Sequence, residues 1–236
     1  MTDTILSESL ASACKRLTSA LHAAERPADA ARLLAVSKTK PAVMIRAVWA
    51  LGQREFGENY VQEALEKQAE LADLTDITWH FIGPLQTNKS RAVAEHFDWV
   101  HSVDRDKLAR RLNNQRPAEL PPLNVCLQVN VSGEASKSGV DFEALPALAE
   151  SVLALPRLRL RGLMAIPAPA ATLEAQRVPL ARLRLALEAL RTRFPEAELD
   201  TLSMGMSDDL EAAILEGATL VRLGTAIFGA RDTAQR

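Results

Sequence analysis

A lysine ends one of the apolar runs of this chain. Lys38 follows the run Leu33–Ser37 and precedes Thr39-Lys40-Pro41, so an amine lies where a buried strand would emerge into a turn. The period-two pattern of a strand places Lys38 on the same face as Leu34 and Val36. Apolar surroundings disfavour the ammonium form and make an amine a nucleophile toward an aldehyde. Lys38 is therefore either a Schiff-base lysine or a surface lysine that closes a strand.

An alternation of short apolar runs with longer segments of helical period surrounds this lysine. The predicted strands are Leu33–Ser37, Gln53–Gly57, Thr78–Ile82, Asp98–Ser102, Asn124–Val131, Leu158–Met164, Leu199–Ser203 and Thr219–Leu223. The predicted helices between them are Ala42–Leu51, Glu58–Ala72, Lys89–Phe97, Asp104–Arg116, Phe142–Leu155, Leu173–Phe194 and Asp208–Glu216. Eight parallel βα units most often close as a TIM barrel, whose active site lies at the C-terminal ends of the strands.

The alternative fold is a doubly wound open sheet. It requires a glycine-rich turn after the first strand, whereas Leu33–Ser37 runs into Lys-Thr-Lys-Pro. No linker divides the chain. Residues 1–32 form a lead-in whose amphipathic helix carries Leu6, Leu10, Leu17 and Leu21 on one stripe. We therefore predict one (β/α)8 TIM-barrel domain over residues 1–236, with an extra N-terminal helix.

The charge pattern of the 236 residues excludes several classes of partner. The 28 basic and 30 acidic side chains give a net charge of -2, and no basic cluster is interleaved with aromatic residues, which argues against nucleic acid. No apolar stretch is long enough to span a membrane, and the charge order at the N-terminus is not that of a signal peptide. The two cysteines lack disulfide or metal spacing. These features predict a cytoplasmic protein.

A barrel would bring the loops after its seventh and eighth strands close to Lys38. TIM barrels often bind phosphate between those two loops. The hydroxyls of Ser207 and Thr225 can donate to a phosphate, and Gly224 lacks the Cβ that would hold a backbone N–H away from it. Ser207 before Asp208-Asp209 also fits an ordinary helix N-cap. We therefore expect the short helix beginning at Thr225 to contribute more to phosphate binding.

Arg222 shares a strand face with Gly224, so we expect its side chain to point into the barrel. A buried guanidinium needs a partner. The partner is either a strand-end carboxylate or the ring nitrogen of a bound pyridine. Because arginine keeps its proton, the second arrangement would leave the pyridine nitrogen unprotonated and the ring a poor electron sink. Carbanion chemistry would then be weak.

Longer blocks of sequence around these residues carry a family resemblance. The blocks are Ala35–Pro41, Phe56–Tyr60, Trp79–Gln86 with Asn88-Lys89, Gly162–Met164, Leu202–Asp208 and Val221–Gly229. Through them the chain closely resembles the pyridoxal phosphate homeostasis protein family, also called the proline synthetase co-transcribed homologues. The resemblance extends from about Leu33 to Arg231.

The resemblance implies a barrel like the N-terminal domain of alanine racemase, with pyridoxal 5'-phosphate (PLP) held covalently on Lys38 as a Schiff base. It assigns the phosphate to the loops after the last two strands and the pyridine nitrogen to the arginine. The cofactor-binding residues that it implies are Lys38, Asn59, Ser207, Arg222, Gly224 and Thr225. Met204 and Met206 are at most side chains that pack on the ring.

The same resemblance implies a PLP carrier in vitamin B6 homeostasis, with indirect effects on amino-acid and keto-acid pools, and not an enzyme. Alanine racemases add a second domain that supplies a catalytic tyrosine, whereas the only tyrosine here is Tyr60, in the second βα unit. The alternatives are a racemase-like enzyme of narrow scope and a class I aldolase without cofactor. We expect a monomer that meets apo PLP-dependent enzymes transiently, and no metal, nucleic-acid or membrane partner.

Other basic residues have two possible roles. Lys40, Lys89 and Lys137 are either solvated loop lysines or secondary aldehyde contacts. His80 ends a strand, and we expect a satisfied core histidine there in preference to a base. His101 has no carboxylate partner that can be recognised from the sequence.

Overall fold

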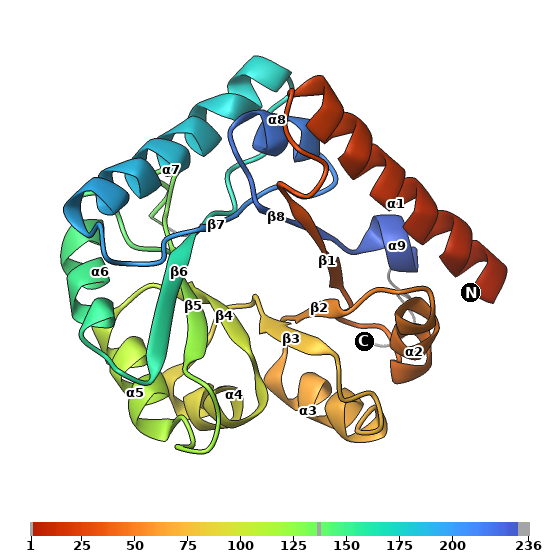
Figure 1. The fold of residues 1–236 in the computed structure, drawn as a ribbon, viewed down its shortest axis with the longest axis horizontal. Helices are drawn as coiled ribbons and strands as arrows, with labels where there is room; N and C mark the ends of the chain where they lie inside the picture. Colours follow the sequence, from red (N-terminus) through yellow and green to blue (C-terminus); the bar gives the residue numbers. More distant parts are fainter. Residues whose placement is uncertain (1, 136–137, 231–236) are drawn as a thin grey trace.

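Eight parallel strands form a closed barrel in the computed structural model, which describes residues 2–135 and 138–230 (Figure 1). The strands are β1 Arg32–Val36, β2 Glu55–Glu58, β3 Thr78–Phe81, β4 Trp99–Val103, β5 Leu123–Gln128, β6 Leu158–Met164, β7 Thr201–Ser203 and β8 Leu220–Leu223. Each strand pairs with the next, and β8 pairs with β1. The predicted TIM barrel is confirmed, and the open-sheet alternative is wrong.

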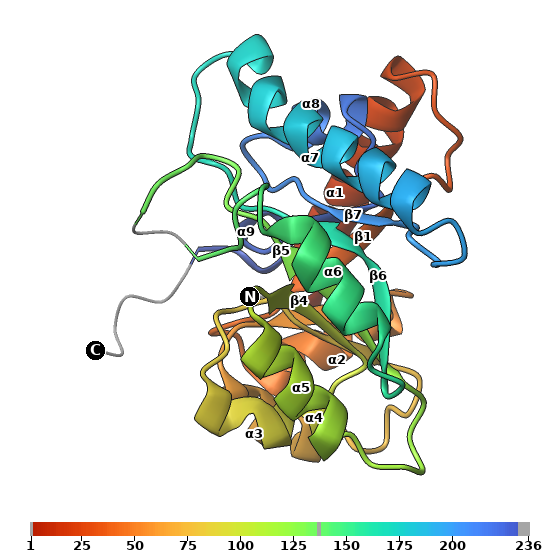
Figure 2. The same cartoon turned by 90° about the vertical axis from the view of Figure 1, so that its left-hand side faces the viewer.

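Helices surround the barrel on its outside. They are α1 Asp3–Ala23, α2 Ala42–Ala50, α3 Val61–Glu70, α4 Ser90–His96, α5 Asp106–Gln115, α6 Leu145–Leu153, α7 Leu173–Arg193, α8 Leu210–Leu215 and α9 Thr225–Phe228, with a 3-10 turn at Thr87–Lys89. Figure 2 shows the strands between one group formed by α1, α7 and α8 and another formed by α3, α4 and α5. The predicted helix Glu58–Ala72 begins too early, because Glu58 is the last residue of β2.

The extra N-terminal helix is confirmed. The side chain of Thr2 caps α1 by accepting from the N–H of Ile5. The predicted apolar stripe of α1 is buried, and the helix packs on α8 and α9. Arg16 of α1 also donates to the carboxylate of Glu211 and, at 2.7 Å, to the carbonyl of Ser207. Helix α1 therefore supports the loop that carries one of the predicted phosphate residues.

Two layers of side chains fill the molecule. The larger core lies between the strands and the helices and includes Leu33 and Ala35. A smaller apolar cluster inside the barrel contains Leu34 and Val36. This alternation confirms the predicted two faces of β1 and places the turn with Lys38 at the end of an inward-facing row. No helix in the described part of the chain is both long and apolar enough to cross a bilayer.

The pairing of β5 with β6 contains an irregularity that depends on a glycine. Val125 pairs with Leu160 and Cys126 with Gly162, so Arg161 is the extra residue of a bulge. Gly162 has a φ of 157°, and a Cβ there would lie 1.8 Å from the carbonyl oxygen of Thr201. Neither the backbone conformation nor the space admits a larger residue.

Replacing Gly162 by alanine should therefore separate β6 from β7. We expect Gly162→Ala to lower the free energy of unfolding by about 3 kcal/mol or more, the upper end for overpacking of a core. Gly133→Ala is the matched control, because Gly133 also has a positive φ of 68° but no atom of residues 2–135 or 138–230 lies within 4 Å of the added carbon. Urea denaturation of both variants measures the difference. Equal losses of unfolding free energy in the two variants would show that the Thr201 carbonyl can move aside without cost.

Candidate functional site

The turn after β1 presents Lys38 at the C-terminal end of the barrel. The side chain of Lys38 is partly buried. The next residue, Thr39, has a φ of 63°, a left-handed conformation that is uncommon outside glycine. The N–H of Lys40 donates to the carbonyl of Ser37 at 3.1 Å and closes the turn. The turn is thus held in a specific and unfavourable backbone conformation, for which other contacts must compensate.

A buried ion-pair network supplies those contacts from α3. The ammonium of Lys67 lies 2.8 Å from the carbonyl of Ser37, 2.8 Å from Glu58 Oε1 and 2.6 Å from Glu63 Oε1. Ser37 Oγ donates to Glu58, and the N–H of Thr39 donates to Glu63 at 2.6 Å. Burial raises the pKa of Glu58, and the charge of Lys67 opposes that rise. The network fixes the residues on both sides of Lys38.

Sequence reasoning missed Lys67. The signal was present, since Lys67 follows the buried Ala64 by three residues and precedes the buried Leu71 by four, which places it on the core-facing stripe of α3. A lysine on such a stripe requires an internal anion. The sequence pattern instead places Glu58, the last residue of β2, at the start of a predicted helix.

Arg222 lies inside the barrel with only 4% of its surface exposed, as predicted. Its Nη1 donates to Ser203 Oγ at 2.7 Å, and its Nη2 donates to the carbonyl of Ala165 at 3.0 Å. Both partners are neutral, so the expected alternative of a carboxylate partner is wrong for the described residues. Burial lowers the pKa of Arg222 to about 10, which leaves the guanidinium charged at neutral pH.

The end of β8 passes very close to the end of β1. In the register of the two strands Leu34 lies opposite Arg222. Two residues further along, a Cβ on Gly224 would lie 3.2 Å from the carbonyl oxygen of Val36. Gly224 also precedes α9, whose first N–H groups have no acceptor within the helix. The first N–H groups of α9 are therefore the donors that this strand end offers to a small anion.

The loop after β7 differs from the predicted N-cap arrangement. Helix α8 begins at Leu210, and Asp209 Oδ1 accepts from the N–H of Met206 at 2.8 Å. Ser207 is therefore not the capping residue, because the acidic side chain two positions later closes the turn. Met204 is buried in the core between strands and helices, so it does not face the site.

The remaining predicted residues have different surroundings. The Oδ1 atom of Asn59 is buried and has no hydrogen-bond partner among the described residues, so this side chain retains an acceptor. Lys40 Nζ donates to the carbonyl of Ala230 at 2.5 Å, and Lys89 is exposed. Lys137 lies outside the described residues. The described residues contain no group of three or more acidic, histidine or cysteine side chains that would hold a metal.

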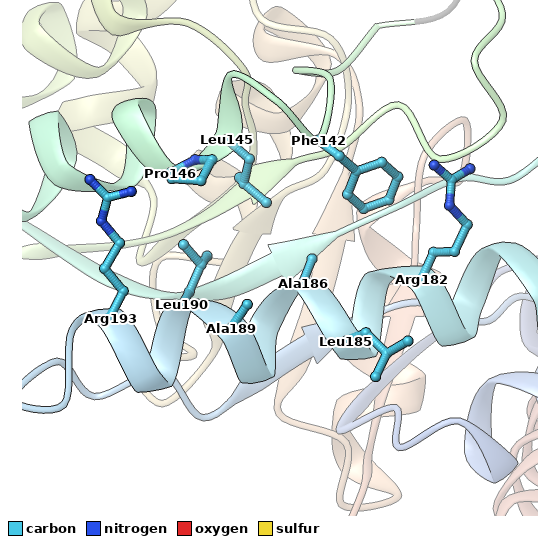
Figure 3. A pocket seen from close by; sticks show the side chains of 9 residues that line it. All are labelled: Phe142, Leu145, Pro146, Arg182, Leu185, Ala186, Ala189, Leu190 and Arg193. Atoms are coloured by element: carbon cyan, nitrogen blue, oxygen red, sulfur yellow. The ribbon is translucent and has the colours of Figure 1, made fainter.

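A cavity of about 550 Å³ is an apolar groove on the outer surface between α6 and α7 (Figure 3). Arg193 and Arg182 stand at its two ends, and Phe142 forms part of one wall. The guanidinium of Arg182 stacks over the ring of Phe142 at 4.5 Å. None of the predicted cofactor residues lines this groove, so it is separate from the strand-end site.

Comparisons with known proteins show the family to which the chain belongs. The alanine racemase N-terminal domain family matches residues 13–232. The pyridoxal phosphate homeostasis protein of Pseudomonas aeruginosa is 65% identical over 227 residues, which are 96% of each chain. That of Escherichia coli K12 is 54% identical over 233 residues, 98% of this chain and 99% of the relative. The chain belongs to the pyridoxal phosphate homeostasis protein family. The resemblance inferred from the sequence blocks is confirmed.

Solved structures of this family and beyond share the fold. PipY of Synechococcus elongatus with PLP bound is 42% identical and superposes with a TM-score of 0.83, covering 95% of this chain and 100% of that chain. The form without PLP gives a TM-score of 0.86. Alanine racemase of Corynebacterium glutamicum, 16% identical, gives a TM-score of 0.71 over 99% of this chain and 63% of that chain. The last similarity shows the barrel fold alone.

The network behind Lys38 can be tested by removing its cation. Lys67→Met should lower the free energy of unfolding by roughly 3–5 kcal/mol, because Glu58 loses its buried partner. The pKa of Glu58, already raised above 4.5 by burial, should rise further. The folded state then keeps a proton that the unfolded state has released, so the variant should become less stable as the pH rises above 4.5.

Urea denaturation at about pH 5 and about pH 8 measures both effects. Lys107→Met, at an exposed position of α5, is the matched control and should change stability by less than about 0.5 kcal/mol. A Lys67→Met loss no larger than that of the control would show that the buried network does not stabilise the turn.

Proposed function

We propose that this chain binds PLP reversibly at the C-terminal ends of its strands and serves in the homeostasis of this form of vitamin B6. The observation that supports it best is the register of β8 on β1. That register puts Arg222, the backbone of Gly224 close against Val36, and the turn with Lys38 on two adjacent strand ends. The PLP-bound structure of PipY, which shares the family and fold, supports the same ligand.

The residues at the strand ends fit the chemistry of PLP. The aldehyde of PLP reacts with primary amines, and Lys38 would hold the cofactor covalently through its amine. Ser207, Gly224 and Thr225 would bind the phosphate through hydroxyl and backbone N–H groups. The Oδ1 of Asn59, which has no partner in the described part of the chain, would accept a hydrogen bond near the ring.

Arg222 would face the pyridine nitrogen and keep its proton, since its pKa remains about 10 in the buried site. A ring nitrogen that receives a hydrogen bond but no proton withdraws few electrons from the rest of the cofactor. Tyr60, the only tyrosine, is half exposed at the start of α3. These features favour a non-catalytic carrier over a racemase-like enzyme of narrow scope. Family membership argues against the class I aldolase.

The carrier would act on the free cofactor pool inside the cell. We propose a monomeric cytoplasmic protein that meets apo PLP-dependent enzymes only transiently. Lys40 would not serve as a second anchor, because its ammonium already donates to the carbonyl of Ala230, which follows α9 in the chain.

The anchor can be tested by the visible spectrum of the purified protein after addition of PLP. The wild type should show an absorption band that borohydride bleaches, and Lys38→Ala should lack it. Lys40→Ala is the matched control, two residues away on the same turn, and should retain the band. A wild type that stays colourless with PLP, or a band that survives in Lys38→Ala, would contradict this assignment.

The carrier role can be tested by transfer. Protein loaded with PLP should reactivate an apo PLP-dependent enzyme faster than the same amount of cofactor released into solution. Stopped-flow activity measurements with a free-PLP scavenger separate the two routes. Transfer no faster than release into solution, or turnover of an amino acid that Lys38→Ala abolishes, would favour storage or catalysis instead.

A further inference from the structure

The interior of this barrel contains a polar column, although barrel interiors are usually filled by branched apolar side chains. The column consists of Arg32 on β1, Glu55 on β2, His80 on β3, His101 on β4, Ser203 on β7 and Arg222 on β8. Strands β4 and β7 are not neighbours in the barrel, so the contact between their side chains crosses its interior. His80, His101 and Ser203 are completely buried.

Each member of the column contacts the next. Arg32 Nε lies 2.8 Å from Glu55 Oε2, and His80 Nε2 lies 3.2 Å from Glu55 Oε1. His80 Nδ1 is 2.9 Å from His101 Nε2, and His101 Nδ1 is 2.7 Å from Ser203 Oγ. Ser203 Oγ then accepts from Arg222 at 2.7 Å. An unbroken path therefore joins the partly exposed N-terminal end of the barrel to the guanidinium at the cofactor end.

The charge states along the column follow from its surroundings. Burial alone would raise the pKa of Glu55, but hydrogen bonds from His80 and Arg32 lower it to about 2. Burial lowers the pKa of His80. Burial, together with the nearby His80 and Arg222, lowers the pKa of His101 well below its usual range. At neutral pH the column thus has one carboxylate, two neutral imidazoles, one hydroxyl and an arginine at each end.

These states permit only one order of donors and acceptors. An ionised carboxylate only accepts, so His80 carries its proton on Nε2. A neutral imidazole has one N–H, so His80 Nδ1 must accept from the Nε2–H of His101. His101 Nδ1 must then accept from the hydroxyl of Ser203. The hydroxyl hydrogen points away from Arg222 and leaves an oxygen lone pair for the Nη1–H group.

We propose that Glu55, His80, His101 and Ser203 form a positioning relay for Arg222. The carboxylate at the N-terminal end of β2 sets both histidine tautomers and, through them, the direction of the serine hydroxyl. Arg222 is then held with one N–H on Ser203 and another on the carbonyl of Ala165, which fixes the plane of its guanidinium. The last step, in which that guanidinium faces the ring nitrogen of PLP, rests on the proposed function, whereas the order of the relay belongs to the protein alone.

The first arm of the test needs no cofactor. The chain has four histidines, of which His22 and His96 are exposed references. In ¹⁵N NMR spectra of the wild type, His80 and His101 should both appear as single Nε2–H tautomers at neutral pH. In Glu55→Gln the terminal amide can either accept from His80 or donate to it, so both histidines should show a mixture of tautomers.

Asp200→Asn is the matched control. Asp200 is another carboxylate near the N-terminal ends of the strands, but it pairs with Arg161 at 2.6 Å and stands outside the column. It should leave the shifts of His80 and His101 unchanged. Unchanged tautomers in Glu55→Gln, or equal effects of the two variants, would overturn the relay.

The second arm measures the cofactor. Ser203→Ala removes the acceptor for Arg222 and should speed PLP release roughly two- to tenfold, the size of one hydrogen bond. Ser203→Thr keeps the hydroxyl and should restore the wild-type rate, while Glu55→Gln should fall between the two. Altered tautomers without any change in release or in the visible band would overturn the positioning role. If the wild type binds no PLP, the proposed function and the last step fail together, and the NMR result still decides the relay itself.

Discussion

The closure of β8 onto β1 is the constraint on which the site depends. Closing a parallel sheet fixes the stagger between its first and last strands, and this stagger sets Arg222 opposite Leu34 and Gly224 against Val36. A one-residue shift of β8 would turn Arg222 outward into the layer of helices. Its guanidinium would then lose its hydrogen bonds to Ser203 and to the carbonyl of Ala165. The arrangement at the C-terminal end of the barrel is therefore determined by backbone pairing before any side chain acts.

Buried charge is balanced on both sides of β1 and β2. Outside the barrel, Lys67 pairs with Glu58 and Glu63 and holds the turn that carries Lys38. Inside the barrel, the column from Glu55 to Arg222 satisfies polar groups that would each be costly alone. The two networks lie on opposite faces of the same two strands, because successive side chains of a strand point to opposite faces. Both reduce the freedom of groups at the strand ends, so a ligand there meets a site that is already arranged.

The sequence was sufficient for those features that depend on local pattern. Alternating runs located all eight strands, and period two placed Leu34 and Arg222 on inward faces. The features that it could not predict depend on contacts between distant residues. Ser203 follows His101 by 102 positions, and the sequence around either residue does not predict their hydrogen bond. Glu58 was misassigned to a helix because a carboxylate at a strand end is explained only by Lys67, whose position is fixed by packing. The N-cap alternative for Ser207 is wrong because Asp209 stands at the N-cap position of α8, a distinction that depends on how the loop folds.

The neutrality of the partners of Arg222 bears on what the site can do. A carboxylate partner would cancel the positive charge and leave little for a ligand, whereas a hydroxyl and a carbonyl fix the group without neutralising it. The charge is then available to whatever lies above the barrel interior. The same burial leaves the pKa at about 10, too high for the guanidinium to release a proton to a pyridine nitrogen near neutral pH. Such an arginine would give a pyridine nitrogen a fixed hydrogen bond without a proton, which suits the proposed carrier because it would hold the ring without activating it.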